Sequence, residues 1–120
     1  MMALTNQNKV YSWGAGQYGI LGHGDESGTD APSLIKDLNK EIIIYIAAGQ
    51  FSSAAINILG NLFIWGQGKF GKLGCGSLEN FFNPQKLYDS CFENEKIFMV
   101  SLGNYHTLCS SGNYKSYIFY

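Results

Sequence analysis

Several short stretches of the chain are rich in hydrophobic β-forming residues, which either alternate with polar ones or form continuous runs, as is typical of β-strands. These stretches are KVYSW (9–13), EIIIYIAAG (41–49), SAAINI (53–58), NLFIW (61–65), KIFMVSLG (96–103) and HTLCS (106–110). The two longest are continuous apolar runs, as expected of buried strands. The one stretch with some helical spacing, SLIKDLNKEI (33–42), is bracketed by Pro32 and polar residues. We therefore predict an all-β chain.

The stretch VYSWGAGQYGILGHG (10–24) recurs as LFIWGQGKFGKLGCG (62–76), an offset of 52 residues. Pro32 and Pro84 keep this offset, and so do Gly60-Asn61 and Gly112-Asn113. IAAGQFSSAAI (46–56) also resembles VSLGNYHTLCS (100–110). The anchors of the pattern are Trp13, Gly14, Gly19, Gly22 and Gly49 in the first copy, and Trp65, Gly66, Gly71, Gly74, Gly103 and His106 in the second. The chain thus contains two copies of a unit of roughly fifty residues.

Four strands per unit with Gly-rich turns describe a blade of a β-propeller. Because proline cannot donate to a sheet, the strand at each proline is expected at a blade edge. We predict a partial propeller of about two four-stranded antiparallel blades. Its expected parts are an N-terminal tail (1–8), a first repeat (9–58), a second repeat (61–110) and the start of a third (111–120).

The motif V-Y-x-W-G-x-G-x-x-G-x-L-G-x-G, followed by a proline and then A-A-G-x-x-x-S-x-A-I, resembles the RCC1-like repeat family (regulator of chromosome condensation) over residues 9–110. The resemblance implies a propeller of about seven blades that acts as a non-catalytic platform for protein interaction. It also implies an alternative, because the founding member is a guanine-nucleotide exchange factor for a Ran-type small GTPase and docks on chromatin. Ser52 departs from the family's histidine, which His106 keeps, and GNYKSYIFY (112–120) lacks the Trp-Gly pair.

Two repeats cannot close a ring, since each unit buries its faces on neighbouring units. Three explanations stay open: a fragment of a longer propeller, blades supplied by partner chains or self-association, and an open remnant. The apolar stretches EIIIYIAA (41–48) and SYIFY (116–120) predict uncovered edges. The isolated chain is therefore expected to associate with itself.

The glycines raise the question of phosphate binding. Gly14, Gly16 and Gly19 spell G-x-G-x-x-G, and residues 66–72 nearly spell a P-loop. Yet Gly22 stands where a following helix would be needed, and Leu73 stands where a P-loop needs Ser or Thr. We expect the glycines to permit tight turns, with no cofactor. Both tryptophans are expected to fill the core, with their indole N–H satisfied locally.

The loops at 25–31 and 77–83 differ most between the copies, and variable loops on a constant scaffold are where binding specificity usually lies. The candidate contact residues are His23, Asp25, Glu26, Asp30, Glu79, Phe81 and Phe82. Adjacent aromatics on a strand point to opposite faces, so one of Phe81 and Phe82 is expected at the surface. His23 is expected to be exposed, and His106 to be a hydrogen-bonded turn residue. Cys75 is either a reactive thiol beside Lys72 or a small turn residue.

Composition narrows the function. Hydrophobic residues make up 46% of the chain and charged residues 14%, which excludes disorder. A net charge of −1 without a basic run predicts neither a nucleic-acid nor a membrane partner. Three cysteines without C-x-x-C predict no zinc site and a reduced, intracellular chain, cytoplasmic or nuclear. With no metal cluster, paired carboxylates or nucleophile–base pair, we expect a protein partner, a small GTPase among the options, and no enzyme activity.

Overall fold

A computed structural model gives the fold of the chain and describes residues 1–74, 78–87 and 92–119. Its strands are β1 (Met2–Leu4), β2 (Val10–Gly14), β3 (Thr29–Leu34), β4 (Ile43–Ala48), β5 (Ser52–Asn57), β6 (Leu62–Gly66), β7 (Phe81–Lys86), β8 (Ile97–Leu102), β9 (Thr107–Ser111) and β10 (Ser116–Phe119). Three short 3₁₀ helices connect them: η1 (Gln17–Gly19), η2 (Lys36–Leu38) and η3 (Lys69–Gly71). The prediction of an all-β chain is confirmed.

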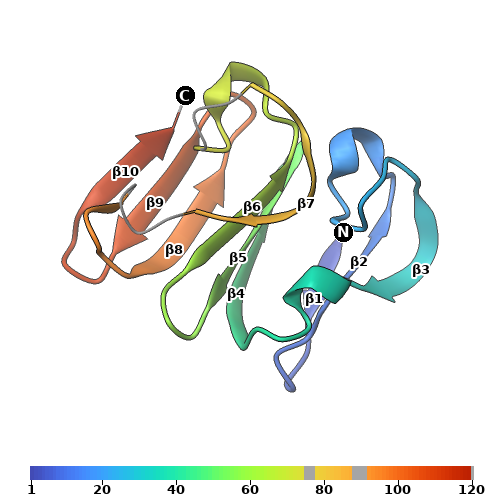
Figure 1. Ribbon diagram of the computed structural model, residues 1–120, viewed down its shortest axis with the longest axis horizontal. Coiled ribbons are helices and arrows are strands. Elements are labelled where there is room, and N and C mark those ends of the chain that lie inside the picture. The colour runs from blue at the N-terminus through green and yellow to red at the C-terminus, as the bar shows by residue number, and fades with distance from the viewer. Residues whose placement is uncertain (75–77, 88–91, 120) are drawn as a thin grey trace.

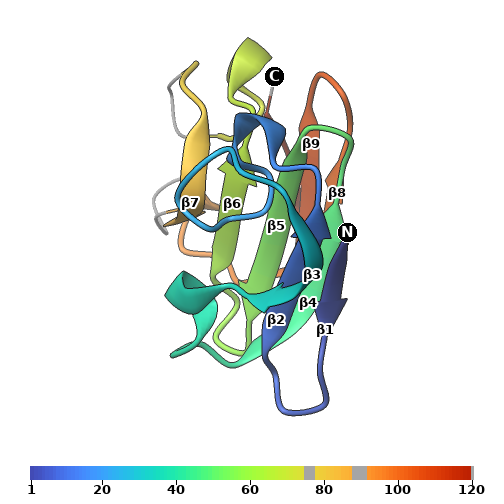
Figure 2. The ribbon, with the colours of Figure 1, turned by 90° about the vertical axis from the view of Figure 1, so that its right-hand side faces the viewer.

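The strands form three antiparallel sheets, in the orders β1-β2-β3, β4-β5-β6-β7 and β8-β9-β10. Figure 1 shows them side by side, like neighbouring blades of a propeller, and Figure 2 shows the first sheet in front of the second. The predicted partial propeller is thereby confirmed. Strands β3 and β7, which carry Pro32 and Pro84, lie at sheet edges as expected.

Each blade is assembled out of phase with the sequence repeat. The four-stranded sheet takes β4 and β5 from the first copy and β6 and β7 from the second. The described part of the chain therefore holds one four-stranded sheet between two three-stranded ones, and not two equal blades. Because the blades are out of phase with the repeat, residues 1–8 do not form the expected tail but contain a strand of the first sheet. Leu4 pairs with Val10, so β1 stands in the first sheet where β5 stands in the second.

The start of the third copy is shifted by two residues from the register that the sequence indicated. The left-handed turn residue before β6 is Gly60 (φ 82°), and the one before β10 is Tyr114 (φ 64°), an offset of 54 residues. The match of Gly60 with Gly112 is therefore wrong. In the corrected register Phe119 takes the place of Trp65. Phe119 lies against Gly74 in the way that Trp65 lies against a glycine of the first copy.

Two apolar clusters fill the spaces between the sheets. The first joins the first two sheets and contains Val10, Ile35, Leu38, Ile43, Ala55, Phe63 and Trp65. The second joins the last two and contains Ala54, Ile56, Leu62, Ile64, Leu73, Leu87, Phe92, Ile97, Val100 and Cys109. Every residue of β5 and β6 is buried, because both faces of the middle sheet are covered.

The apolar runs at 41–49 and 96–103 were expected to be buried strands, and this is only half correct. They form β4 and β8, which are edge strands of their sheets. About half the surface of Ile44 (49%) and Phe98 (46%) is exposed. The uncovered apolar edges were predicted at 41–48 and 116–120, which agrees with the edge positions of β4 and β10 in their sheets.

Candidate interaction surface

A glycine corner follows β2 in the first copy and β6 in the second. Gly14 and Gly66 have φ values of 107° and 108°, which other residues rarely adopt. A Cβ on Gly16 would collide with the Ser27 carbonyl group, and a Cβ on Gly68 would collide with that of Glu79. The chain's own backbone therefore fills the space beside these glycines. The following 3₁₀ helices have three residues each, too few for a helix that binds phosphate.

The first corner is held to the middle sheet by Trp65. Its indole N–H donates to the Ile20 carbonyl oxygen at 2.9 Å, and the Ser53 hydroxyl donates to the same oxygen at 2.9 Å. Gly22 leaves room for the ring, because a Cβ there would lie 2.9 Å from the indole nitrogen. Trp65 is fully buried, as expected, but its hydrogen-bond partner is 45 residues away and not local. Trp13 is half-buried on the first sheet.

The second corner is held differently. Thr107 stands in the place of Ser53, and its buried hydroxyl has no hydrogen-bond partner in the described part of the chain. Lys72 stands in the place of Ile20 and is fully buried. Its ammonium group donates to Gln67 Oε1 at 3.0 Å and to the Asn104 carbonyl at 3.1 Å.

The ammonium of Lys72 also lies 5.4 Å from the centre of the Phe51 ring. Burial lowers the pKa of Lys72 below its usual value. Sequence reasoning missed this role, because Lys72 has no counterpart in the first copy. A single charge at an apolar position of a repeat was the available signal.

The acidic loop of the first copy lies beside its corner. Asp25 Oδ1 accepts a hydrogen bond from the Ser27 N–H at 3.0 Å, and Glu26 Oε2 accepts one from the Tyr18 N–H at 3.1 Å. Both side chains are exposed, and so is Asp30 at the start of β3. The loop is therefore braced by two of its own carboxylates and presents acidic groups to solvent.

In the second copy, Phe81 and Phe82 lie on β7. Phe81 packs against both apolar clusters, whereas 36% of Phe82 is exposed. Phe82 lies against Gly19 of the first corner, and its carbonyl accepts the Gly24 N–H at 2.9 Å. This segment thus bridges two sheets while one aromatic reaches the surface. Glu79, just before it, is exposed.

The two histidines have different surroundings. His23 is half-buried, and its Nε2 lies 2.9 Å from Ser12 Oγ, so the expectation of an exposed side chain is wrong. Ser12 is fully buried and donates to the Leu21 carbonyl at 2.6 Å, which excludes it as a nucleophile. His106 is exposed, and its backbone carbonyl accepts the Gly103 N–H at 2.9 Å in a turn. Cys75 lies outside the described residues.

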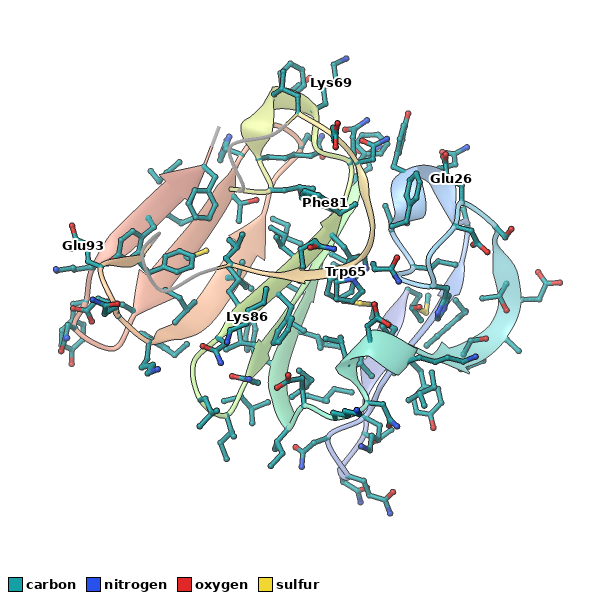
Figure 3. The ribbon with its side chains drawn as sticks, viewed as in Figure 1. Glu26, Trp65, Lys69, Phe81, Lys86 and Glu93 are labelled. Carbon is teal, nitrogen blue, oxygen red and sulfur yellow. The ribbon has the colours of Figure 1, made fainter. Side chains whose placement is uncertain are left out.

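The corners also carry repeated aromatic pairs that sequence reasoning missed. Tyr18 meets Phe51 edge to face, with ring centres 5.6 Å apart, and Phe70 meets Tyr105 at 5.1 Å. Tyr18 and Phe70 both have positive φ values, 60° and 69°, which is uncommon for aromatic residues. The available signal was an aromatic at the same position of both G-x-x-G corners. Figure 3 shows Lys69 and Glu26 at this end of the blades.

Among the described residues, no group of three or more His, Cys, Asp or Glu side chains could hold a metal ion. No helix within those residues is long and apolar enough to cross a membrane.

The sequence profile described as "Regulator of chromosome condensation (RCC1) repeat" matches residues 7–56 and 60–110. The chain is 34% identical to the mouse E3 ubiquitin-protein ligase HERC2 over 110 residues, which is 90% of this chain and 2% of that protein. It is 40% identical to the ultraviolet-B receptor UVR8 of Arabidopsis thaliana over 99 residues, 82% of this chain and 22% of that protein.

Solved structures share the fold. Human WBSCR16 superposes with a TM-score of 0.87 at 25% identity, covering 98% of this chain and 29% of that one. Yeast RCC1 (Prp20), solved with Kap60 bound, superposes with a TM-score of 0.80 at 24% identity and the same coverage. The chain spans less than a third of each of these proteins. With two matched repeats in adjoining propeller sheets, the chain belongs to the RCC1 repeat family.

Proposed function

We propose that the chain is a non-catalytic module that binds a protein partner through the loops at 25–31 and 77–83. One observation carries this proposal: Gly14, Gly19 and Gly22 have nearly the same φ values as Gly66, Gly71 and Gly74, whereas the loops beside the two corners differ in chemistry. The first loop is acidic, with Asp25, Glu26 and Asp30, and the second carries Phe82 at the surface. Variable loops on a rigid scaffold are the usual place for recognition.

The similar proteins of known structure support a protein-binding role for RCC1 repeats. Yeast RCC1 (Prp20) has been solved with Kap60 bound, and Prp20p is described with binding properties to Gsp1p and histones. HERC2 is named a ligase, but this chain matches 2% of it, so the ligase name describes a far larger protein. These likenesses favour a binding role for RCC1 repeats. The absence of catalysis and the intracellular location stay predictions.

A finer candidate is guanine-nucleotide exchange on a Ran-type small GTPase. Its support is the likeness to RCC1, and its candidate groups are Asp25, Glu26 and Asp30. The assay is release of a fluorescent guanine nucleotide from the GTPase with and without the chain. Acceleration that disappears in the variant D25N/E26Q/D30N would establish exchange, and no acceleration at high concentration would remove this candidate.

The binding proposal is tested by affinity capture from the cells that make the protein, with quantitative mass spectrometry. The loop variant D25N/E26Q/D30N is compared with a control variant, E93Q/E95Q. The control removes the charges of the two acids that pair with Lys115 and keeps their side-chain oxygens, and the exposed pair with Glu93 contributes little to stability. We expect partners that the loop variant loses and the control keeps. Equal capture by both variants would contradict the proposal.

A further inference from the structure

A cavity of about 590 Å³ lies between the first two sheets, on the side of the acidic loop. It is lined by residues of the loop before β3, of β3 itself, of η2 and of β7, among them His23, Asp25, Thr29, Ser33, Lys36, Asp37 and Asn83. Asn83 closes one side by donating from its amide to Asp37 Oδ2 at 3.0 Å. The cavity therefore depends on the packing of two sheets and not on one loop alone.

Two of the hydroxyl groups that line the cavity have their protons committed within the chain. The hydroxyls of Thr29 and Ser33 both donate to the Ala31 carbonyl, each at 3.2 Å. Both residues line the cavity. What these side chains offer to a ligand is therefore their oxygen lone pairs.

The His23 ring also has its proton committed within the chain and offers an acceptor to a ligand. Ser12 uses its one proton on the Leu21 carbonyl at 2.6 Å, so its oxygen accepts from His23 Nε2 at 2.9 Å. A neutral ring with its proton on Nε2 leaves Nδ1 as an acceptor. His23 thus adds a further acceptor to the cavity lining.

Two carboxylates complete the lining. Asp25 Oδ1 accepts from the Ser27 N–H and Asp37 Oδ2 accepts from Asn83, so each keeps one oxygen for a ligand. Lys36 is the one cationic side chain that lines the cavity, and neither carboxylate forms an ion pair with any described residue. The acceptors of Thr29, Ser33 and His23 thus stand beside two negative charges against one positive.

We propose that this cavity binds the guanidinium group of an arginine side chain presented by the protein partner, an inference that rests on the proposed function. A guanidinium carries five N–H donors in a planar fork and no acceptor, which complements acceptors that come from several directions. An ammonium is a more compact and more strongly hydrated donor. The open cavity beside the variable loop can receive a side chain from another protein surface.

The direct test uses the peptide Ac-Gly-Arg-Gly-NH₂ and its citrulline counterpart, which keeps the shape and loses the charge. Binding is followed by NMR on the His23 ring and the Asn83 side-chain amide. We expect the arginine peptide to shift these signals and the citrulline peptide to bind about tenfold more weakly, as the loss of a charge-assisted hydrogen bond predicts. Equal binding of the two peptides, or no shift of these signals, would overturn the proposal.

Variants locate the site. Asp25→Asn and Asp37→Asn keep the oxygens that accept from Ser27 and Asn83, so the fold is retained while the charge is lost. We expect the double variant to bind the arginine peptide about tenfold more weakly. The matched control is Glu93→Gln, an exposed acid at the far side of the molecule and outside the lining, which should leave binding unchanged. Undiminished binding by the double variant would contradict the site.

The partner captured above separates this proposal from the proposed function. Asp37→Asn changes the cavity and none of the three loop acids. A partner that is lost with D25N/E26Q/D30N and kept in full by Asp37→Asn would leave the binding function standing and overturn the arginine site. A partner weakened by both variants, together with binding of the arginine peptide, supports both.

Discussion

Trp65 and Ile20 lie 45 residues apart and join the first corner to the middle sheet through one hydrogen bond of 2.9 Å. The bond crosses from one sequence copy to the next. A tryptophan that looks like local core filling is therefore the contact that fixes one blade against its neighbour.

Trp65→Phe should lower the free energy of unfolding by about 1–2 kcal/mol or more, because the half-buried Ile20 carbonyl loses one of its two donors and the smaller ring leaves space in the core. Trp13→Phe is the matched control, since Trp13 is half-buried and makes no side-chain hydrogen bond to the described residues. Denaturant unfolding measures both variants. Equal losses would show that the indole N–H contributes nothing specific.

Gly16→Ala and Gly68→Ala should each destabilise the chain by about 2–3 kcal/mol, because the added Cβ would press on a backbone carbonyl that cannot move alone. Gly112→Ala is the control, with no atom within 4 Å of the new Cβ. Its stability should stay within about 1 kcal/mol of the parent. If these corner variants unfold at the same denaturant concentration as Gly112→Ala, the close approach is not what requires glycine.

Lys72 predicts a pH dependence. Its pKa in the folded chain is lowered by burial from the usual 10.5. Between the two values the unfolded chain binds more protons, so this group makes the free energy of unfolding rise with pH. The free energy of unfolding of the parent minus that of Lys72→Met should therefore increase as pH rises toward 10.5. It should be constant at pH values well below the pKa of Lys72 in the folded chain. Lys69→Met, at an exposed lysine nearby, serves as the control. A difference independent of pH would contradict the burial of the charge.

Cys109 should resist alkylation in the folded chain. Burial raises the pKa of its thiol to about 12, and the thiolate is the reactive species. Peptide mapping after treatment with iodoacetamide at pH 8 should find Cys109 modified only after denaturant is added. Rapid modification without denaturant would mean that the second cluster opens readily.

Much of the fold could be predicted from the sequence, because strand patterns, proline edges and glycine corners are local signals. The phase of the blades could not. Strands β5 and β6 form a hairpin within one blade, but the repeated motif begins at β6, so the repeat boundary falls between these two strands. The register of the third copy failed for a related reason, since Tyr114 adopts a left-handed turn that the sequence pattern assigns to glycine.

The candidate site was predictable as loops but not as a cavity. The chemistry of Asp25 was visible in the sequence, whereas Asp37 and Asn83 meet only because two sheets pack together. The role of Lys72 could not be predicted from the repeat, because the first copy has Ile20 in its place. Its partners Gln67 and Asn104 belong to different sheets and share no motif.

The most direct test of the binding role is site-specific photo-crosslinking in the cells that make the protein. A crosslinker is placed at Glu26, in the acidic loop, or at Glu93, at the far side of the molecule in Figure 3. Both positions are exposed, so accessibility alone does not separate them. The proposed function predicts a discrete crosslinked partner from position 26 and none from position 93. Crosslinks from position 93 alone, or the same products from both, would contradict it.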